Sequence, residues 1–350
     1  MADGKPASRL GALKALSLTG ARWRQREAEQ EPVALLESSG IHPIVARVLA
    51  ARGVENPEQA HQLLHVSIDD LHDPFLMHGM DIGVARLERA IRDKEPVRVV
   101  TDYDVDGTTS SLILQATLKL RGLTRVSFSI PHRMKEGYGF GISSVDEAHK
   151  DGIKLIVTAD IGVKDGEAVT HAKSLGIDVI ILDHHLPPDT DVPADATAVL
   201  CPPQKACSYP NPALAACGVS LKFAQALLSE HPKFDAIFRS MMKLAAIGTV
   251  ADIVDLFTPE NRAIVTLGLR ELNEGTHSPG LRALLDVAGI QPGSIDEGHL
   301  GYRIGPRINA AGRMDSAHAI VDLFAEMDVA RARLPRRSLW VFEAIVDASW

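Results

Sequence analysis

Three aspartates at alternate positions, Asp102, Asp104 and Asp106, end the β-branched run at residues 97–101 and precede Gly107. The run is typical of a buried strand, and a helical pattern begins just after the glycine. Ligands bind at the carboxyl ends of strands in α/β sheets, so we expect these carboxylates at a functional edge. Because like charges repel, a divalent cation is the simplest means of keeping them ionised together, and oxygen ligands favour magnesium or manganese over zinc or copper.

The same aspartate pattern has two other interpretations. It opens the calcium loop of an EF-hand, and aspartate-rich turns also occur without a metal. An EF-hand needs glutamate at the twelfth loop position, which counted from Asp102 is Ile113, and a strand precedes this loop. The EF-hand is therefore excluded, whereas a metal site and a solvated turn are equal alternatives for this stretch alone.

Polar residues recur at the end of apolar elements three more times along the chain. Asp160 follows the strand-like run at 155–159, and His184 follows the run at 179–182. Asp252 comes after two further helical patterns. One such carboxylate is unremarkable, but four placements of the same kind predict a shared site at one edge of a sheet.

Together these residues supply ligands for two divalent ions. Four carboxylates and one neutral imidazole can hold two ions that share one carboxylate, and paired ions assist in-line displacement at phosphorus. The set consists of Asp104, Asp106, Asp160, His184 and Asp252. The sequence contains neither a G-x-S-x-G nor a G-x-x-x-x-G-K-S/T motif, so it indicates neither a serine nucleophile nor an ATP site.

Two adjacent histidines compete for the role of metal ligand. Neighbouring side chains on an extended segment point to opposite sides, so at most one of His184 and His185 is expected to bind a metal directly. We assign His184 to the metal and His185 to the substrate phosphate as a donor. A hydrogen-bonded structural histidine is the alternative for each.

Two stretches carry residues suited to nucleic-acid phosphates or bases. In residues 301–313, glycine and proline predict an irregular backbone, and three arginines with one asparagine supply donors. Alone, such a stretch is more often a solvated loop, but beside a phosphoesterase site it favours phosphate binding. Tyr138, preceded by His132, Arg133 and Lys135, either stacks on a base or packs in the core.

Composition places these motifs in a globular protein. The 350 residues are 45% hydrophobic, enough for a sizeable core, and suggest two domains or one large α/β domain with additions. A net charge of −8 does not indicate nucleic-acid binding overall, although one basic surface can coexist with it. Three cysteines are too few for a disulfide framework, and no apolar leader or spanning segment occurs, so we expect reduced thiols in a soluble cytoplasmic protein without membrane contact.

Strand and helix patterns alternate in the middle of the chain, which predicts a parallel sheet with crossover helices. The expected strands are 97–101, 125–130, 155–159 and 179–182. The expected helices are 82–92, 108–120, one from 143 with overlapping capping boxes at Ser143 and Ser144, one ending at 175, 219–228 and 234–246. Before them, a helical region without chemistry of its own includes patterns at 44–49 and 57–64.

The motifs resemble those of a known family. Their sequences are Asp-Tyr-Asp-Val-Asp-Gly at 102–107, Thr-Ala-Asp-Ile-Gly at 158–162, Asp-His-His at 183–185 and Gly-Thr-Val-Ala-Asp at 248–252. This order resembles the DHH phosphoesterases. The stretch 305–313 and the segment 133–139 narrow the resemblance to the RecJ branch, the single-stranded-DNA-specific exonucleases, over roughly residues 23–324.

The resemblance implies an α/β DHH phosphoesterase domain with a manganese- or magnesium-dependent 5′-to-3′ exonuclease activity. Such an enzyme releases mononucleotides from single-stranded DNA in repair and recombination, with a single-stranded-DNA-binding protein and a helicase as partners. Carried over by position, the metal ligands are those named above, with Asp160 bridging. Asp102, Asp160 and His185 are the implied catalytic residues. The implied substrate contacts are Tyr138, Arg307, Asn309 and Arg313.

The chain departs from the family at two positions of the core and at its C-terminus. Thr101 stands where RecJ proteins usually have glycine, which is a minor change. Val100 stands where many DHH proteins have histidine, so one metal is expected to have fewer protein ligands.

We expect a helical region at 1–75, the catalytic domain at 76–270, the substrate motif and the start of a connecting helix at 271–333, and an atypical tail at 334–350. The DHH-associated and OB domains are then missing, so we expect a folded metal site with weak DNA affinity and weak exonuclease activity.

Two rival functions follow from the same resemblance. The first is a DHH phosphoesterase for short oligonucleotides, cyclic dinucleotides or pyrophosphate, which the absent DNA-binding domain favours and the motif at 305–313 disfavours. The second is a non-catalytic replication or repair scaffold, which the complete set of acidic ligands disfavours.

Overall fold

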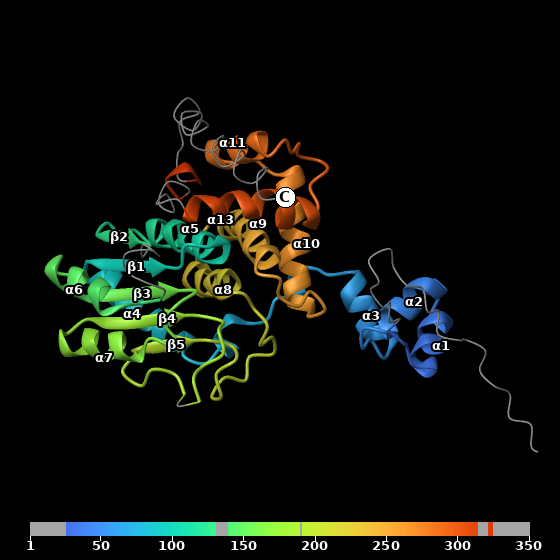
Figure 1. Ribbon diagram of the computed structural model, residues 1–350, viewed down its shortest axis with the longest axis horizontal. Helices are drawn as coiled ribbons and strands as arrows, with labels where there is room; N and C mark the ends of the chain where they lie inside the picture. The colour runs from blue at the N-terminus through green and yellow to red at the C-terminus, as the bar shows by residue number, and fades with distance from the viewer. Residues whose placement is uncertain (1–25, 131–138, 190, 314–320, 325–350) are drawn as a thin grey trace, which may run out of the picture. The chain divides into compact units, whose positions relative to one another are not determined.

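The structure is a computed structural model that describes residues 26–130, 139–189, 191–313 and 321–324 (Figure 1). The chain divides into two compact units, the first ending at His65 and the second beginning at Val66. Within the described residues, no helix is both long and apolar enough to cross a membrane.

The first unit contains three short helices, α1 (Gln30–Ser38), α2 (Pro43–Ala50) and α3 (Pro57–Leu64). Proline at the first position of α2 and α3 suits a helix start, where no backbone N–H is needed, and the Asn56 side chain caps α3 by accepting from the Gln59 N–H. The helical N-terminal region is therefore confirmed.

The second unit contains a five-stranded sheet in which every pair is parallel. Its spatial order is β2-β1-β3-β4-β5, and its strands are β1 (Val97–Thr101), β2 (Val126–Ser129), β3 (Leu155–Ala159), β4 (Asp178–Leu182) and β5 (Ala198–Leu200). The α/β fold class and four of the strands are as predicted. Edge strand β5 was missed because three residues carry no periodic signal.

Helices cover both faces of the sheet (Figure 1). On one face, Val97 and Val99 pack with residues of α4 (Met80–Arg92), α5 (Val105–Leu120) and α8 (Ala216–Leu228). On the other face, the alternate side chains pack with α6 (Ile142–Lys150) and α7 (Gly166–Ser174). Burial on both faces explains why these strands are continuously apolar.

The remaining helices extend the first of these layers. They are α9 (Phe234–Ala251), α10 (Pro259–Glu274), α11 (Pro279–Val287), α12 (Glu297–His299), the π-helix η3 (Leu300–Ile304) and α13 (Gly305–Arg313), with short 3₁₀ turns η1 (Ile68–Asp70) and η2 (Pro74–Leu76) before α4. A separate apolar cluster joins α9, α11, η3 and α13.

Two local predictions were wrong. Helix α6 begins at Ile142 after Gly141 and has no side-chain cap, so the capping boxes at Ser143 and Ser144 do not form. The start is fixed instead by packing, since the helix buries Val145 and Ala148. The stretch expected to be irregular, 301–313, is helical. It continues from α12 through the π-helix η3 into α13, the π-helical turn lies directly before Pro306, and Ile308 is buried in the apolar cluster.

Candidate metal centre

The carboxyl edge of the sheet gathers the predicted ligands from four segments of the chain. Asp102 follows β1 and Asp104 caps α5, with its Oδ1 accepting from the Gly107 N–H at 3.0 Å. Asp160 follows β3, and His184 follows β4. Asp252 lies at the C-terminal end of α9.

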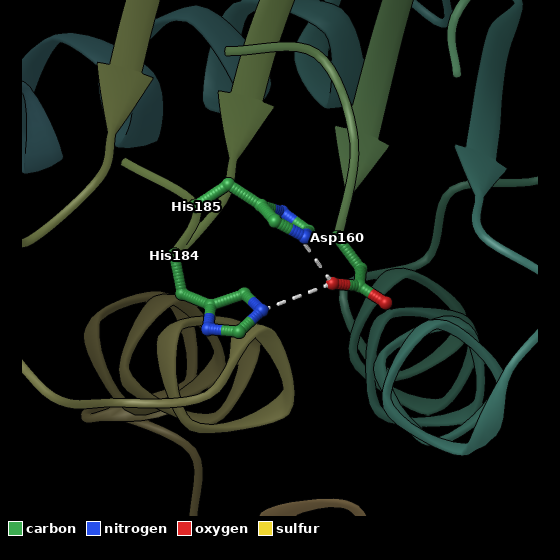
Figure 2. Close-up of side chains that lie close together, drawn as sticks. All are labelled: Asp160, His184 and His185. Carbon is green, nitrogen blue, oxygen red and sulfur yellow. Dashed lines mark ion pairs between the residues drawn. The ribbon is translucent and has the colours of Figure 1, made fainter. Parts of the chain in front are cut away.

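The side chains meet around Asp160 and His184. His184 Nε2 lies 3.3 Å from Asp160 Oδ1 and 3.7 Å from Asp106 Oδ2, and its Nδ1 lies 3.7 Å from Asp252 Oδ2. His185 Nδ1 lies 4.0 Å from the same Asp160 oxygen. Figure 2 shows both imidazoles directed toward that carboxylate.

Three overlapping groups have ligand atoms within 4.8 Å of one another. They are Asp160 with His184 and His185, Asp106 with His184 and Asp252, and Asp102 with Asp104 and Asp160. Asp160 and His184 each belong to two groups. The second oxygen of Asp160, Oδ2, is buried and has no hydrogen-bond partner among the described residues. Mostly carboxylate ligands and an orphaned buried oxygen suit magnesium or manganese.

The electrostatics of the cluster also favour a cation. Burial, followed by repulsion from Asp106 and Asp104, raises the pKa of Asp160 well above its usual value. Burial likewise raises the pKa of Asp106, although His184 and the Cys217 N–H act against this. Burial and repulsion from Asp106 raise the pKa of Asp252 to about 6. A divalent ion would offset this repulsion.

Helix α8 holds Asp106 from outside the predicted motifs. Its first two backbone N–H groups donate to the carboxylate, from Ala216 to Oδ2 at 2.7 Å and from Cys217 to Oδ1 at 2.8 Å. The positive end of the helix dipole adds to this stabilisation. Nothing in the sequence near Ala216 indicated this role, since main-chain donors leave no residue signature.

Asp183 is buried and holds both histidines through hydrogen bonds. It belongs to the Asp-His-His motif, but no role was predicted for it from the sequence. Its Oδ1 accepts from the His184 N–H at 2.8 Å and the His185 N–H at 3.1 Å, and lies 2.7 Å from His185 Nδ1. Its Oδ2 accepts from the Val163 N–H at 3.0 Å, which ties the loop after β3 to the loop after β4. Burial would raise the pKa of Asp183, but His185 and these N–H groups outweigh it and lower that pKa.

The prediction that His184 and His185 point to opposite sides was wrong. Their ring centroids are only 4.6 Å apart. The chain is not extended here because the Asp183 carboxylate accepts from both successive N–H groups and bends it. The hydrogen bond to Asp183 raises the pKa of His185. Which histidine binds metal stays a prediction.

Gly107, the glycine of the first motif, is required by close packing. A Cβ at this position would overlap with the Asp102 carbonyl oxygen and lie 2.8 Å from Asp102 Cα. Without a side chain, the first turn of α5 can fold back over β1. The turn thereby brings Asp102, Asp104 and Asp106 together.

The predicted substrate contacts are only partly described. Arg307 lies in α13, and its Nη1 donates to the Arg303 carbonyl at 2.8 Å. Asn309 Oδ1 is buried without a hydrogen-bond partner among the described residues. Arg313 ends α13, but its side chain lies outside the description, as does all of Tyr138. Helix α13 packs against α5, which contains Asp106 and is capped by Asp104, and against α9, which Asp252 follows.

Comparison with known proteins identifies the fold. Residues 96–249 match the family model described as "DHH family, N-terminal domain". The single-stranded-DNA-specific exonuclease RecJ of Bacillus subtilis (strain 168) is 39% identical over 308 residues, which is 88% of this chain and 38% of that protein. RecJ of Escherichia coli (strain K12) is 36% identical over 301 residues, 83% of this chain and 51% of its own length. The chain thus spans about half or less of these curated relatives.

Solved structures of RecJ proteins are also similar to this chain. A crystal structure of exonuclease RecJ bound to manganese has a TM-score of 0.67 at 31% identity and covers 77% of this chain and 66% of that one. RecJ from Thermus thermophilus in complex with Mn²⁺ has a TM-score of 0.69 at 27% identity, over 90% of this chain and 43% of its own. Residues 96–249 therefore form a DHH-family N-terminal domain, and the chain as a whole is similar to the RecJ exonucleases.

Proposed function

We propose that this chain is the catalytic core of a divalent-metal-dependent exonuclease that degrades single-stranded DNA from the 5′ end to nucleoside 5′-monophosphates. One observation carries the proposal. Three groups of ligand atoms overlap around Asp160 and His184, and Asp160 keeps a buried oxygen without a hydrogen-bond partner among the described residues. Sequence similarity to RecJ proteins supports the choice of substrate and polarity.

The residues proposed to hold two Mn²⁺ or Mg²⁺ ions are those predicted from the sequence, Asp104, Asp106, Asp160, His184 and Asp252. Asp160 is proposed to bridge, since it belongs to two of the overlapping groups. Bound ions of this kind neutralise phosphate charge and stabilise in-line displacement at phosphorus. RecJ structures are known with manganese and with magnesium, which supports either ion.

His185 is proposed to act on the substrate phosphate as a cation. Asp183 holds Nδ1 of its ring and raises the pKa of the imidazole, which favours the protonated form. Asp102 is proposed to support the bridging residue, because its carboxylate lies within the group formed with Asp104 and Asp160. Arg307, Asn309, Arg313 and Tyr138 are the proposed contacts to DNA phosphates and bases.

The biological setting belongs to the same proposal. The relatives' names support single-stranded DNA as the substrate. DNA repair and recombination in the cytoplasm, with a single-stranded-DNA-binding protein and a helicase as partners, follow from the resemblance.

The test is hydrolysis of a long single strand by this chain and by Asp160→Asn, with Mn²⁺. A 5′ label should appear first as mononucleotide, a 3′ label should stay on shortening strands, and both signals should disappear with EDTA and in the variant. A dinucleotide and a duplex serve as comparison substrates. Hydrolysis of the dinucleotide alone would indicate a small-substrate phosphoesterase. Manganese binding without hydrolysis of any substrate would indicate a scaffold.

A further inference from the structure

A second buried polar cluster lies at the start of α10, built by Glu260 and Asn261. Both side chains are completely buried, at 0% exposure. Neither belongs to the groups of metal-compatible ligands. Buried polar side chains are costly unless they are fully hydrogen-bonded, so a cluster of this kind needs a reason.

Asn261 joins two loops that are distant in sequence. Its Nδ2 donates to the Ala213 carbonyl at 2.7 Å and to the Asp255 carbonyl at 2.9 Å. Its Oδ1 accepts from Asn211 Nδ2 at 2.9 Å. All three bonds use one planar amide, so the two loops are held at a fixed separation.

Each of these loops is adjacent to a carboxylate of the metal centre. Ala213 lies just before α8, whose Ala216 and Cys217 N–H groups hold both oxygens of Asp106. Asp255 is in the turn that follows Asp252 at the end of α9. Asp106 and Asp252 approach His184 from different sides, at 3.7 Å each. Asn261 therefore links the segment that holds Asp106 to the segment that carries Asp252, and both aspartates belong to the ligand group that includes His184.

Glu260 holds Asn211, the residue whose side chain donates to the Asn261 amide. Its Oε1 accepts from Tyr209 Oη at 2.7 Å and from the His72 N–H at 3.1 Å, and its Oε2 accepts from Asn211 Nδ2 at 3.2 Å. Lys222 Nζ, also buried, completes the cluster 3.4 Å from Glu260 Oε1. A network in which each member has partners restricts motion more than its separate bonds would.

We propose that Asn261 is a positioning residue of the metal centre. Its side-chain amide sets the distance between the α8 terminus that holds Asp106 and the turn that carries Asp252. The inference rests on the proposed function for the identity of the metal, but the bridge itself is a property of the metal-free protein. Residues that orient metal ligands from outside commonly change metal affinity by about 10- to 100-fold when mutated.

The chain offers a matched control on the same helix. Asn273 of α10 also uses its Nδ2 to join two carbonyls, those of Leu269 and Ile295, at 2.9 Å each. Its Oδ1 accepts from the Gly293 and Ile295 N–H groups. Asn273→Ala removes a comparable set of bonds, and none of those partners holds a predicted metal ligand.

The experiment compares Asn261→Ala with Asn273→Ala in the full chain. Mn²⁺ affinity is measured by titration, and amide hydrogen exchange of residues 213–218 is measured in EDTA. We expect Asn261→Ala to weaken Mn²⁺ binding at least about 10-fold and to speed exchange of the Ala216 and Cys217 amides. We expect Asn273→Ala to change neither.

Each outcome decides the inference. Wild-type Mn²⁺ affinity together with unchanged amide protection in Asn261→Ala would overturn it, as would equal effects in the two variants. If the wild-type chain itself does not bind Mn²⁺, the proposed function fails, and hydrogen exchange alone then decides whether the bridge positions α8. If Asn261→Ala does not fold, Asn261→Asp replaces it, because aspartate keeps the shape and the acceptor but loses both donated bonds.

Discussion

At the scale of single residues, Asp160 combines an uncommon backbone conformation with an unfavourable charge. Its φ of +64° lies in the left-handed region, which aspartate and asparagine tolerate better than other non-glycine residues. Its carboxylate is buried among other carboxylates, which raises its pKa. Asp160→Asn keeps the backbone preference and removes the charge. We predict that it abolishes Mn²⁺ binding and yet stabilises the metal-free fold by about 1 kcal/mol or more.

Urea unfolding in EDTA measures that stability. Asp160→Ala is the comparison, because alanine also removes the charge but fits the left-handed backbone less well by about 1–2 kcal/mol. Asp160→Asn should therefore be the more stable of the two variants. Equal unfolding midpoints for the wild type and Asp160→Asn would contradict the electrostatic argument.

Ile253 also has a backbone conformation that its residue type disfavours. It follows Asp252, its φ is +58°, and its β-branched side chain is 89% exposed. Because little packing would be lost, Ile253→Asn should stabilise the protein by about 1 kcal/mol. Leu186→Asn is the control, since Leu186 is 73% exposed without a positive φ. The thermal unfolding midpoint should rise for the first variant only, and a shared rise would point to the loss of an exposed apolar side chain instead of backbone strain.

At the scale of elements, the close crossing of α9 with α5 and α8 brings Asp252 and Asp106 to the same place. A Cβ on Gly248 would overlap with Thr109 Oγ1 of α5 and lie 2.6 Å from Cys217 Sγ of α8. We predict that Gly248→Ala lowers the free energy of unfolding by about 1–3 kcal/mol through overpacking, and weakens Mn²⁺ binding because the helices separate.

Gly166→Ala in α7 is the matched substitution for this prediction. Apart from its chain neighbours and the backbone of its own helix, no described atom lies within 4 Å of the position its Cβ would take. Gly166 is the first residue of α7, where alanine gains less than the about 1 kcal/mol over glycine that it gains in a helix interior, so this variant should be about as stable as the wild type. Calorimetry and manganese titration of both variants test the contrast, and a tolerated Gly248→Ala would show that the helices can adjust.

Strands β1, β3 and β4 could be predicted from the sequence, whereas the role of the α8 terminus and the helix at 305–313 could not. Periodicity identified β1, β3 and β4 because burial on both faces makes them continuously apolar, and topology then placed Asp160 and His184 at one edge. It could not identify the α8 terminus that holds Asp106, since backbone donors are independent of residue type. It misjudged 305–313 because glycine and proline are usual in loops, whereas here the π-helix η3 directly precedes Pro306 and the buried Ile308 packs the segment into the apolar cluster.

At the scale of the whole molecule, stability is expected to depend on pH in opposite ways with and without metal. Folding raises the pKa of Asp106, Asp160 and Asp252, the last from 3.8 to about 6. Between the unfolded and folded values the native state binds more protons, so its stability falls as pH rises through that interval. Folding also raises the pKa of His185 above 6.5. His185 therefore stabilises the fold below pH 6.5, and this stabilisation is lost as pH rises through its folded pKa. Its contribution thus falls with pH, as do those of the three aspartates. Asp183, whose pKa is lowered, loses its contribution only below 3.8.

The raised pKa values of these groups should therefore make unfolding in EDTA easier as pH rises above about 4, and Asp252→Asn should flatten the part of that profile below about pH 6. Metal binding requires deprotonated ligands, so Mn²⁺ affinity should rise over the same range. At a fixed excess of Mn²⁺ the added stability grows with affinity, and the two profiles should diverge as pH rises. Urea titrations at several pH values, with EDTA or with Mn²⁺, measure both curves. Parallel profiles would mean that the ion binds away from these carboxylates.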